Sequence, residues 1–147
     1  MGRTSEFFQN FDGTPCDIFW TDDFEHPAGH EKLYRTLNHA DQNSYIMCGS
    51  LLKRMKKSTK NGGVGVLKDL GLKNQHSYTL IEVKEVILDD NKVEYLVFLR
   101  NPTGNIYCKD EEVWKGDWSP LSQKWTAKTR KQCNYWITEE EIKKAKD

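Results

Sequence analysis

Hydrophobic and polar residues alternate most regularly over residues 76–99. The apolar positions lie on both sides of a polar stretch at residues 89–92: Tyr78, Leu80, Val83, Val86 and Leu88 before it, and Val93, Tyr95, Val97 and Leu99 after it. Such alternation is typical of strands with one buried face, and an acidic, Asn-containing turn favours a hairpin between them. Pro102 cannot donate a ladder hydrogen bond, so the second strand should end near Asn101.

Two helices are predicted outside this hairpin. Pro27 favours a helix start, and Leu33, Tyr34 and Leu37 then form one apolar stripe at helical spacing. This helix should end near residues 38–42. At the other end of the chain, residues 138–141 read Thr-Glu-Glu-Glu, a capping box that predicts the start of a short helix.

Further strands are predicted upstream of the hairpin. Residues 45–51 form an apolar run that predicts a buried strand, and residues 16–20 are compatible with a shorter one. Residues 53–63 are basic and end in two glycines, which favours a solvated connection over an anion-binding patch. We therefore expect one α+β domain over residues 1–147, an antiparallel sheet with a few helices and no internal repeat.

Charge and composition exclude several classes of function. Lys plus Arg and Asp plus Glu both number 22, so the formal net charge is zero. This balance argues against nucleic acid or an anionic membrane as a partner. The five Trp side chains could stack on nucleic-acid bases, but the chain has no excess of basic residues to bind the phosphates. No apolar run is long enough for a membrane span or a signal peptide. We expect a cytoplasmic location, in which the four cysteines are free thiols rather than a disulfide framework.

His76 is the first candidate for chemistry. A hairpin brings its position, at the start of one strand, close to Asn101 at the end of the next. A turn centred on residues 90 and 91 does not place the two opposite each other, so a bulge or twist is expected between them. An Asn that binds one ring nitrogen leaves the other nitrogen facing a thiol, which is the arrangement of Cys–His–Asn proteases. The alternative is a structural His beside ordinary Asn-Pro turn chemistry.

A nucleophile for such a pair is not evident. Cys16 has acidic neighbours in sequence, which disfavour a thiolate, and Cys48 lies in an apolar run that predicts an inert, buried thiol. Cys108 and Cys133 follow His76 and break the chain order of the papain-like triad. His26 and His30 are spaced four apart, but Pro27 and Gly29 disfavour a helical metal site there.

Several motifs resemble the calpain family of cysteine proteases. Residues 71–86 read GLKNQHSYTLIEVKEV and are similar to the segment around the calpain catalytic His, and YLVFLRNPTG is similar to the strand that ends in Arg-Asn-Pro-Trp-Gly. Residues 114–119 match W-x-G-x-W-S, and residues 135–138 are similar to Phe-Trp-Met-Ser. The resemblance covers most of the chain and implies the second half of the calpain protease core, with His76 as catalytic base and Asn101 as its orienting partner.

Compared with the pattern of an active calpain, this sequence departs in three places. The family's Q-G-x-x-G-D-C-W segment, which carries the nucleophile, does not occur in this sequence. Thr103 stands where the family has a Trp that shields the His–Asn hydrogen bond, and the pair is then expected to be wetter and weaker. Val113, Pro120, Gln132 and Asn134 stand where the family has acidic calcium ligands, so no metal or other cofactor is expected unless Asp110, Glu111 and Glu112 compensate.

Two functions follow as expectations. The first is a calpain-like endopeptidase subdomain that supplies His76 and Asn101, inactive as this chain alone, with a Cys-bearing half as partner and a peptide or protein as substrate. The second is a pseudoenzyme, a calpain-like module kept for binding within a larger assembly. An unrelated α+β domain with accidental matches is a third possibility.

Overall fold

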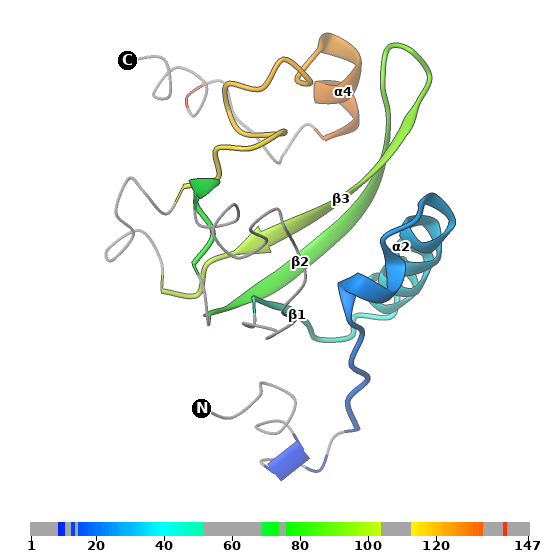
Figure 1. Cartoon of the computed structure of the whole chain (residues 1–147), viewed down its shortest axis with the longest axis vertical. Coiled ribbons are helices and arrows are strands. Elements are labelled where there is room, and N and C mark those ends of the chain that lie inside the picture. The colour runs from blue at the N-terminus through cyan, green and yellow to red at the C-terminus, as the bar shows by residue number, and fades with distance from the viewer. Residues whose placement is uncertain are drawn as a thin grey trace.

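The fold was analysed in a computed structural model, which describes residues 9–10, 13, 15–51, 69–73, 76–103, 113–133 and 140. Within them the order of elements is η1 (Thr21–Phe24), α2 (Pro27–Gln42), β1 (Met47–Leu51), β2 (His76–Ile87), β3 (Val93–Arg100) and α4 (Ala127–Gln132). The strands form one antiparallel sheet in the order β1-β2-β3. Figure 1 shows the long β2–β3 hairpin as the centre of the molecule. The predicted α+β class with an antiparallel sheet is confirmed.

The hairpin contains the predicted irregularity. Leu80 pairs with Leu99, whereas Glu82 pairs with Phe98, so Ile81 is an extra residue on β2. Such a bulge bends the strand and shifts its register by one residue. Because side chains alternate between faces, it lets Leu80 and Val83, on the two sides of Ile81, keep a common face despite their odd spacing.

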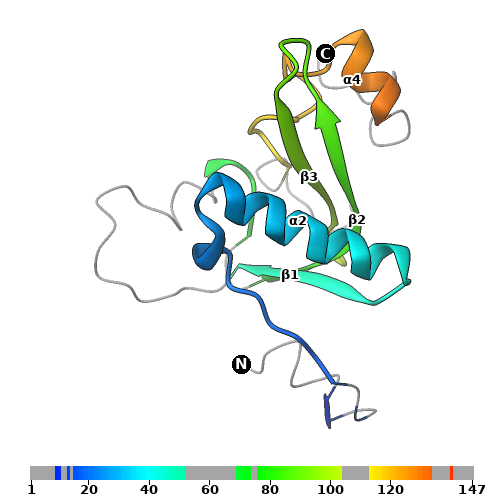
Figure 2. The ribbon, with the colours of Figure 1, turned by 90° about the vertical axis from the view of Figure 1, so that its right-hand side faces the viewer.

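The two faces of the hairpin are covered by different parts of the chain. The helix α2 lies against one face, where Tyr34 stacks on Tyr95 at 4.6 Å between ring centroids. Residues 113–126, which carry three tryptophans and are called the Trp loop below, lead into α4 near the hairpin tip. Figure 2 shows α2 in front of the sheet and α4 beside the tip.

The core is small and lies under the second face. Val86 and Cys133 are fully buried and Trp125 nearly so, with Leu96 and Trp118 packed against them. Trp118 and Trp125 meet edge to face at 4.9 Å, a favourable geometry for two indoles. These two tryptophans therefore serve as core residues.

Several expectations about single elements were confirmed and others were wrong. The helix α2 ends at Gln42 as predicted, and β3 ends at Arg100, directly before Asn101. Residues 15–20 form no strand, and β1 is exposed at Cys48 rather than buried. The helix α4 was not predicted. The basic segment at residues 53–63 and the capping box at residues 138–141 lie outside the described residues, apart from Glu140.

The start of α2 corrects the view that Pro27 and Gly29 disrupt a helix. His26 is the N-cap residue, and its Nδ1 accepts from the Gly29 backbone N–H at 2.9 Å. Pro27 occupies the first turn, where its missing N–H costs nothing. Gly29 is required because a Cβ there would lie 2.8 Å from the Phe24 backbone. His26 therefore caps the helix, a structural use of this side chain.

Candidate active site

The structure brings His76 and Asn101 together at one end of the hairpin. The His76 Nε2 and the Asn101 Oδ1 are 2.8 Å apart, and both residues are partly buried. His76 is the first residue of β2, and Asn101 follows the last residue of β3. Continuing the register past Arg100, which pairs with Thr79, would place Asn101 opposite Tyr78, two residues from His76 on the same face. The contact is therefore a diagonal one across the two strands.

The carboxamide of Asn101 is oriented by the residue two positions further on. The Thr103 backbone N–H donates to Asn101 Oδ1 at 3.2 Å, and the Thr103 hydroxyl lies 2.8 Å from the same oxygen. A backbone N–H can only donate, so the atom that faces it must be the amide oxygen. The oxygen then accepts from His76 Nε2–H, which leaves Nδ1 as the unprotonated nitrogen of a neutral imidazole. This tautomer has its free lone pair directed away from Asn101.

The His76 ring is held from the other side by Tyr78. The two rings meet edge to face at 4.9 Å with an interplanar angle of 86°. Tyr78 is buried, and its hydroxyl accepts from the Lys73 backbone N–H at 2.8 Å. A buried ring with a satisfied hydroxyl is a rigid support, so the imidazole is fixed by packing as well as by its hydrogen bond.

The described cysteines do not complete this pair. Cys48 pairs with Thr79, and alternation along β2 places both side chains on the face opposite to that of His76, three residues before Thr79. Cys133 is fully buried in the core, and burial raises the pKa of its thiol, although the positive charge of Lys84 offsets part of this effect. Cys16 precedes η1 in an irregular segment, and Cys108 lies outside the described residues.

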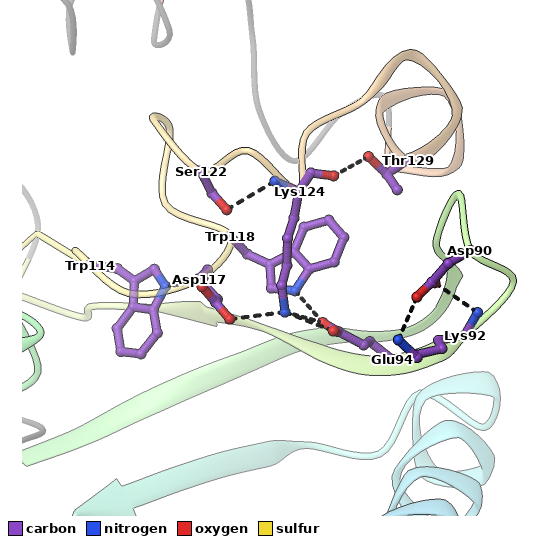
Figure 3. Close-up of polar contacts among 9 residues, drawn as sticks. All are labelled: Asp90, Lys92, Glu94, Trp114, Asp117, Trp118, Ser122, Lys124 and Thr129. Atoms are coloured by element: carbon purple, nitrogen blue, oxygen red, sulfur yellow. Dashed lines mark hydrogen bonds and ion pairs between the residues drawn. The ribbon is translucent and has the colours of Figure 1, made fainter.

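The Trp loop contains a second polar cluster, on the hairpin next to the core (Figure 3). The Lys124 Nζ lies 2.7 Å and 2.9 Å from the two carboxylate oxygens of Glu94 and 2.9 Å from Asp117 Oδ2. The Trp118 indole N–H donates to the same Glu94 carboxylate at 2.8 Å. Hydrogen bonds to Glu94 are the main cause of the raised pKa of Lys124, with a further contribution from Asp117.

The positions at which the family resemblance implies calcium ligands are occupied differently. Val113 and Pro120 carry no side-chain oxygen. The Gln132 amide is engaged with the hairpin, since it accepts from the Ile87 N–H at 3.0 Å and donates to the Ile87 carbonyl at 2.9 Å. Asp110, Glu111, Glu112 and Asn134 lie outside the described residues. The described side chains at these positions do not fit Ca²⁺, which needs six or more oxygen ligands.

Comparison with known proteins identifies the class and then the family. The hairpin, its helices and the His–Asn pair are consistent with half of a papain-like protease core. A family model described as calpain family cysteine protease matches residues 1–144. The chain therefore belongs to the calpain family of cysteine proteases. This membership excludes the accidental resemblance considered from the sequence.

Two curated relatives are similar over part of their length. Human calpain-14 is 35% identical over 83 aligned residues, which cover 50% of this chain and 11% of that protein. The calpain-type cysteine protease ADL1 of Oryza sativa subsp. japonica is 27% identical over 104 residues, 71% of this chain and 4% of that protein. The chain thus spans only a small part of these relatives. No helix among its described residues has the length and apolar character needed to cross a membrane.

The role of Thr103 was missed from the sequence. It was considered only as the loss of a shielding Trp, and its side chain is indeed exposed. Its two hydrogen bonds to Asn101 are those of an Asn turn, for which Asn followed by Pro and Thr is a recognisable signal.

Proposed function

We propose that this chain supplies the base and the orienting amide of a calpain-type Cys–His–Asn endopeptidase site. The hydrogen bond of 2.8 Å between His76 Nε2 and Asn101 Oδ1 is the observation that carries the proposal. It sets the tautomer in which Nδ1 accepts the proton of a thiol and later returns it to the leaving amine. The nucleophilic Cys comes from another segment, so the isolated chain does not hydrolyse peptides.

Exposed apolar residues support a partner segment. Tyr45 and Ile46 precede the edge strand β1 and are 63% and 80% exposed. Large exposed apolar groups at a sheet edge favour contact with a further unit of protein. A Cys-bearing protease half is the partner that this reading requires, and a peptide or protein chain is the substrate. The buried Cys133, which forms no disulfide, suits a reducing, cytoplasmic compartment.

Peptide turnover by the longest natural polypeptide that contains this chain tests the proposal. His76→Ala should abolish cleavage of a fluorogenic peptide, and Asn101→Ala should lower kcat by about 10²-fold or more because the tautomer is no longer fixed. His39→Ala is a matched control, since His39 is an exposed residue near the end of α2 and far along the chain from the pair. Wild-type cleavage that survives His76→Ala would contradict the assignment.

A non-catalytic binding module is the second candidate. Thr103 is exposed and gives the His–Asn pair no apolar cover, which favours a site released from selection for catalysis. Folded wild-type protein of the longest natural form that cleaves no peptide or casein, while still binding a protein partner, would support this candidate over the first.

We also propose that the function of this chain does not depend on calcium. Val113 and Pro120 cannot ligate, and the amide of Gln132 is bound to Ile87. Calorimetric titration of the chain should therefore give no saturable heat at micromolar Ca²⁺. A clear isotherm would contradict this and direct attention to Asp110, Glu111 and Glu112.

A further inference from the structure

Glu94, Asp117, Trp118 and Lys124 form what is called the Lys124 cluster below. In it, carboxylates from a strand and a loop surround one positive charge. Three carboxylate oxygens from two residues lie 2.7–2.9 Å from one ammonium group. The carboxylates come from different elements, since Glu94 is on β3 and Asp117 is in the Trp loop. The ammonium therefore neutralises two anions that would otherwise repel each other across the gap between strand and loop.

Trp118 adds a further favourable contact for a positive charge. Its ring lies 5.8 Å from the Lys124 Nζ, within the range of a cation–π interaction, while its indole N–H donates to Glu94. The backbone of Trp118 has a φ of 66°, which is uncommon for a bulky residue and needs support from its surroundings. Figure 3 shows the ammonium between the two carboxylates and beside this ring.

The far end of the same loop packs on the segment that precedes the active-site strand. The Lys115 N–H donates to the Leu70 carbonyl at 2.9 Å. Gly71 approaches so closely that a Cβ there would lie 1.9 Å from the Val113 oxygen. The contact of residues 113–116 with residues 70–71 therefore reports whether the Trp loop is closed.

We propose that Lys124 is a built-in cation that holds the Trp loop closed on β3, in the manner in which a bound metal ion orders a loop in other proteins. The proposal goes beyond the catalytic assignment and does not depend on it. It gives a reason for the calcium independence proposed above, because the chain carries the ordering charge itself. Its readouts concern loop closure in the full 147-residue chain and require no peptide cleavage.

Hydrogen exchange followed by NMR tests the proposal at both ends of the loop. The probes are the Trp118 indole N–H, which is bonded to Glu94, and the Lys115 amide, which is bonded to Leu70. Lys124→Met keeps most of the stem and removes the charge, and exchange at both probes should become about tenfold faster. Lys124→Arg should return most of the protection. Calcium at about 10 mM, a concentration above the dissociation constants of weak sites, should return part of it in Lys124→Met and leave wild type unchanged.

Two further variants keep the test decisive. Lys92→Met removes an ion pair with Asp90 that is exposed on the same hairpin, and it should leave both probes unchanged. Glu94→Gln retains an acceptor for both donors but loses the charge, so exchange at both probes should accelerate less than in Lys124→Met. It replaces Lys124→Met as the test if that variant does not fold. Unchanged exchange in Lys124→Met and Glu94→Gln overturns the proposal. So does a loss in Lys124→Met that neither arginine nor calcium reverses, or an equal calcium response in wild type.

Discussion

The thiols of Cys133 and Cys48 lie in opposite environments, and this difference can be measured. Cys133 is fully buried with a raised pKa, while Cys48 is exposed on the edge strand β1. The thiolate is the reactive form, so at pH 8 iodoacetamide should modify Cys48 at least about tenfold faster than Cys133. Peptide mass spectrometry assigns each site. Equal rates in the folded protein would show that the core around Val86 is open.

Gly71 is a position where both conformation and space exclude a side chain. Its φ is +92°, and a Cβ would meet the Val113 oxygen at 1.9 Å. Gly71→Ala should lower the free energy of unfolding by about 2 kcal/mol or more. Gly13→Ala is the matched control, since Gly13 has a φ of +72° but nothing within 4 Å of the added Cβ. Its cost of about 1–2 kcal/mol should come from the left-handed backbone alone and stay below that of Gly71→Ala. Urea denaturation compares the two, and similar costs would contradict the close contact.

At the residue scale, the candidate site was predictable only where the position of a residue in the hairpin determines its neighbours. His76 and Asn101 lie at the two strand ends that a hairpin must bring together, and the resemblance named the same pair. The position of Tyr78 against the imidazole was not foreseen, because it depends on how Lys73 and the strand pack. The prediction that Cys48 is buried was wrong for a related reason: an apolar run does not distinguish a central strand from an edge strand.

At the scale of elements, the apolar residues of the hairpin differ widely in burial. Val86 on β2 is fully buried in the core, whereas Val97 on β3 is 47% exposed. Val86→Ala should destabilise the chain by about 2 kcal/mol through the lost contacts and the remaining cavity. Val97→Ala removes the same methyl groups and lowers the β propensity by the same amount, but at an exposed position. It should therefore lower the free energy of unfolding by less than about 1 kcal/mol. Chemical denaturation measures both, and a larger effect at Val97 would place the core on the other face.

The Lys124 cluster predicts a loss of stability at alkaline pH. The pKa of Lys124 is raised above the ordinary 10.5 in the folded state, so its contribution is fully present below 10.5 and is lost as the pH rises through the folded value. The free energy of unfolding of wild type should exceed that of Lys124→Met by about 1 kcal/mol at pH 8, and the two should converge above the folded pKa. The raised pKa of Tyr34 also lowers stability above pH 10, but equally in both proteins. A difference independent of pH would argue against the ammonium as the cause.

The elements differ in how far the sequence determines them. Alternation and the polar turn were sufficient for β2 and β3, and the strand ends indicated the bulge at Ile81. The helix α4 was missed because its sequence, AKTRKQ, has no apolar stripe. Its stability comes from side-chain hydrogen bonds that no apolar pattern signals. The Thr129 hydroxyl donates to the Lys124 carbonyl, five residues earlier, at 2.6 Å, and the Gln132 amide binds the distant Ile87 on β2. Propensity cannot reveal a helix that tertiary hydrogen bonds define.

At the scale of the whole molecule, the described residues bury few apolar side chains. Five hydrophobic residues are buried: Tyr78, Val83, Val86, Trp125 and Cys133. The core lies under the hairpin tip, whereas the His76–Asn101 pair lies at the opposite end of the hairpin, beside the edge strand β1. This separation suits a site completed by another unit, because contacts made at the open end need not disturb the core. It also predicts which apolar residues that unit covers.

Hydroxyl-radical footprinting compares the isolated chain with the longest natural polypeptide that contains it. Tyr45 and Ile46, at 63% and 80% exposure, should be oxidised readily in the isolated chain. If the proposed protease half covers the β1 edge, their oxidation should be at least about threefold slower in the longer protein. Val86, which is fully buried, gives the protected baseline in both samples. Equal oxidation of Tyr45 and Ile46 in the two proteins would mean that the β1 edge stays open, so that any nucleophile must approach His76 from another direction. Protection of both residues together with His76-dependent cleavage would connect the exposed edge with the completed site.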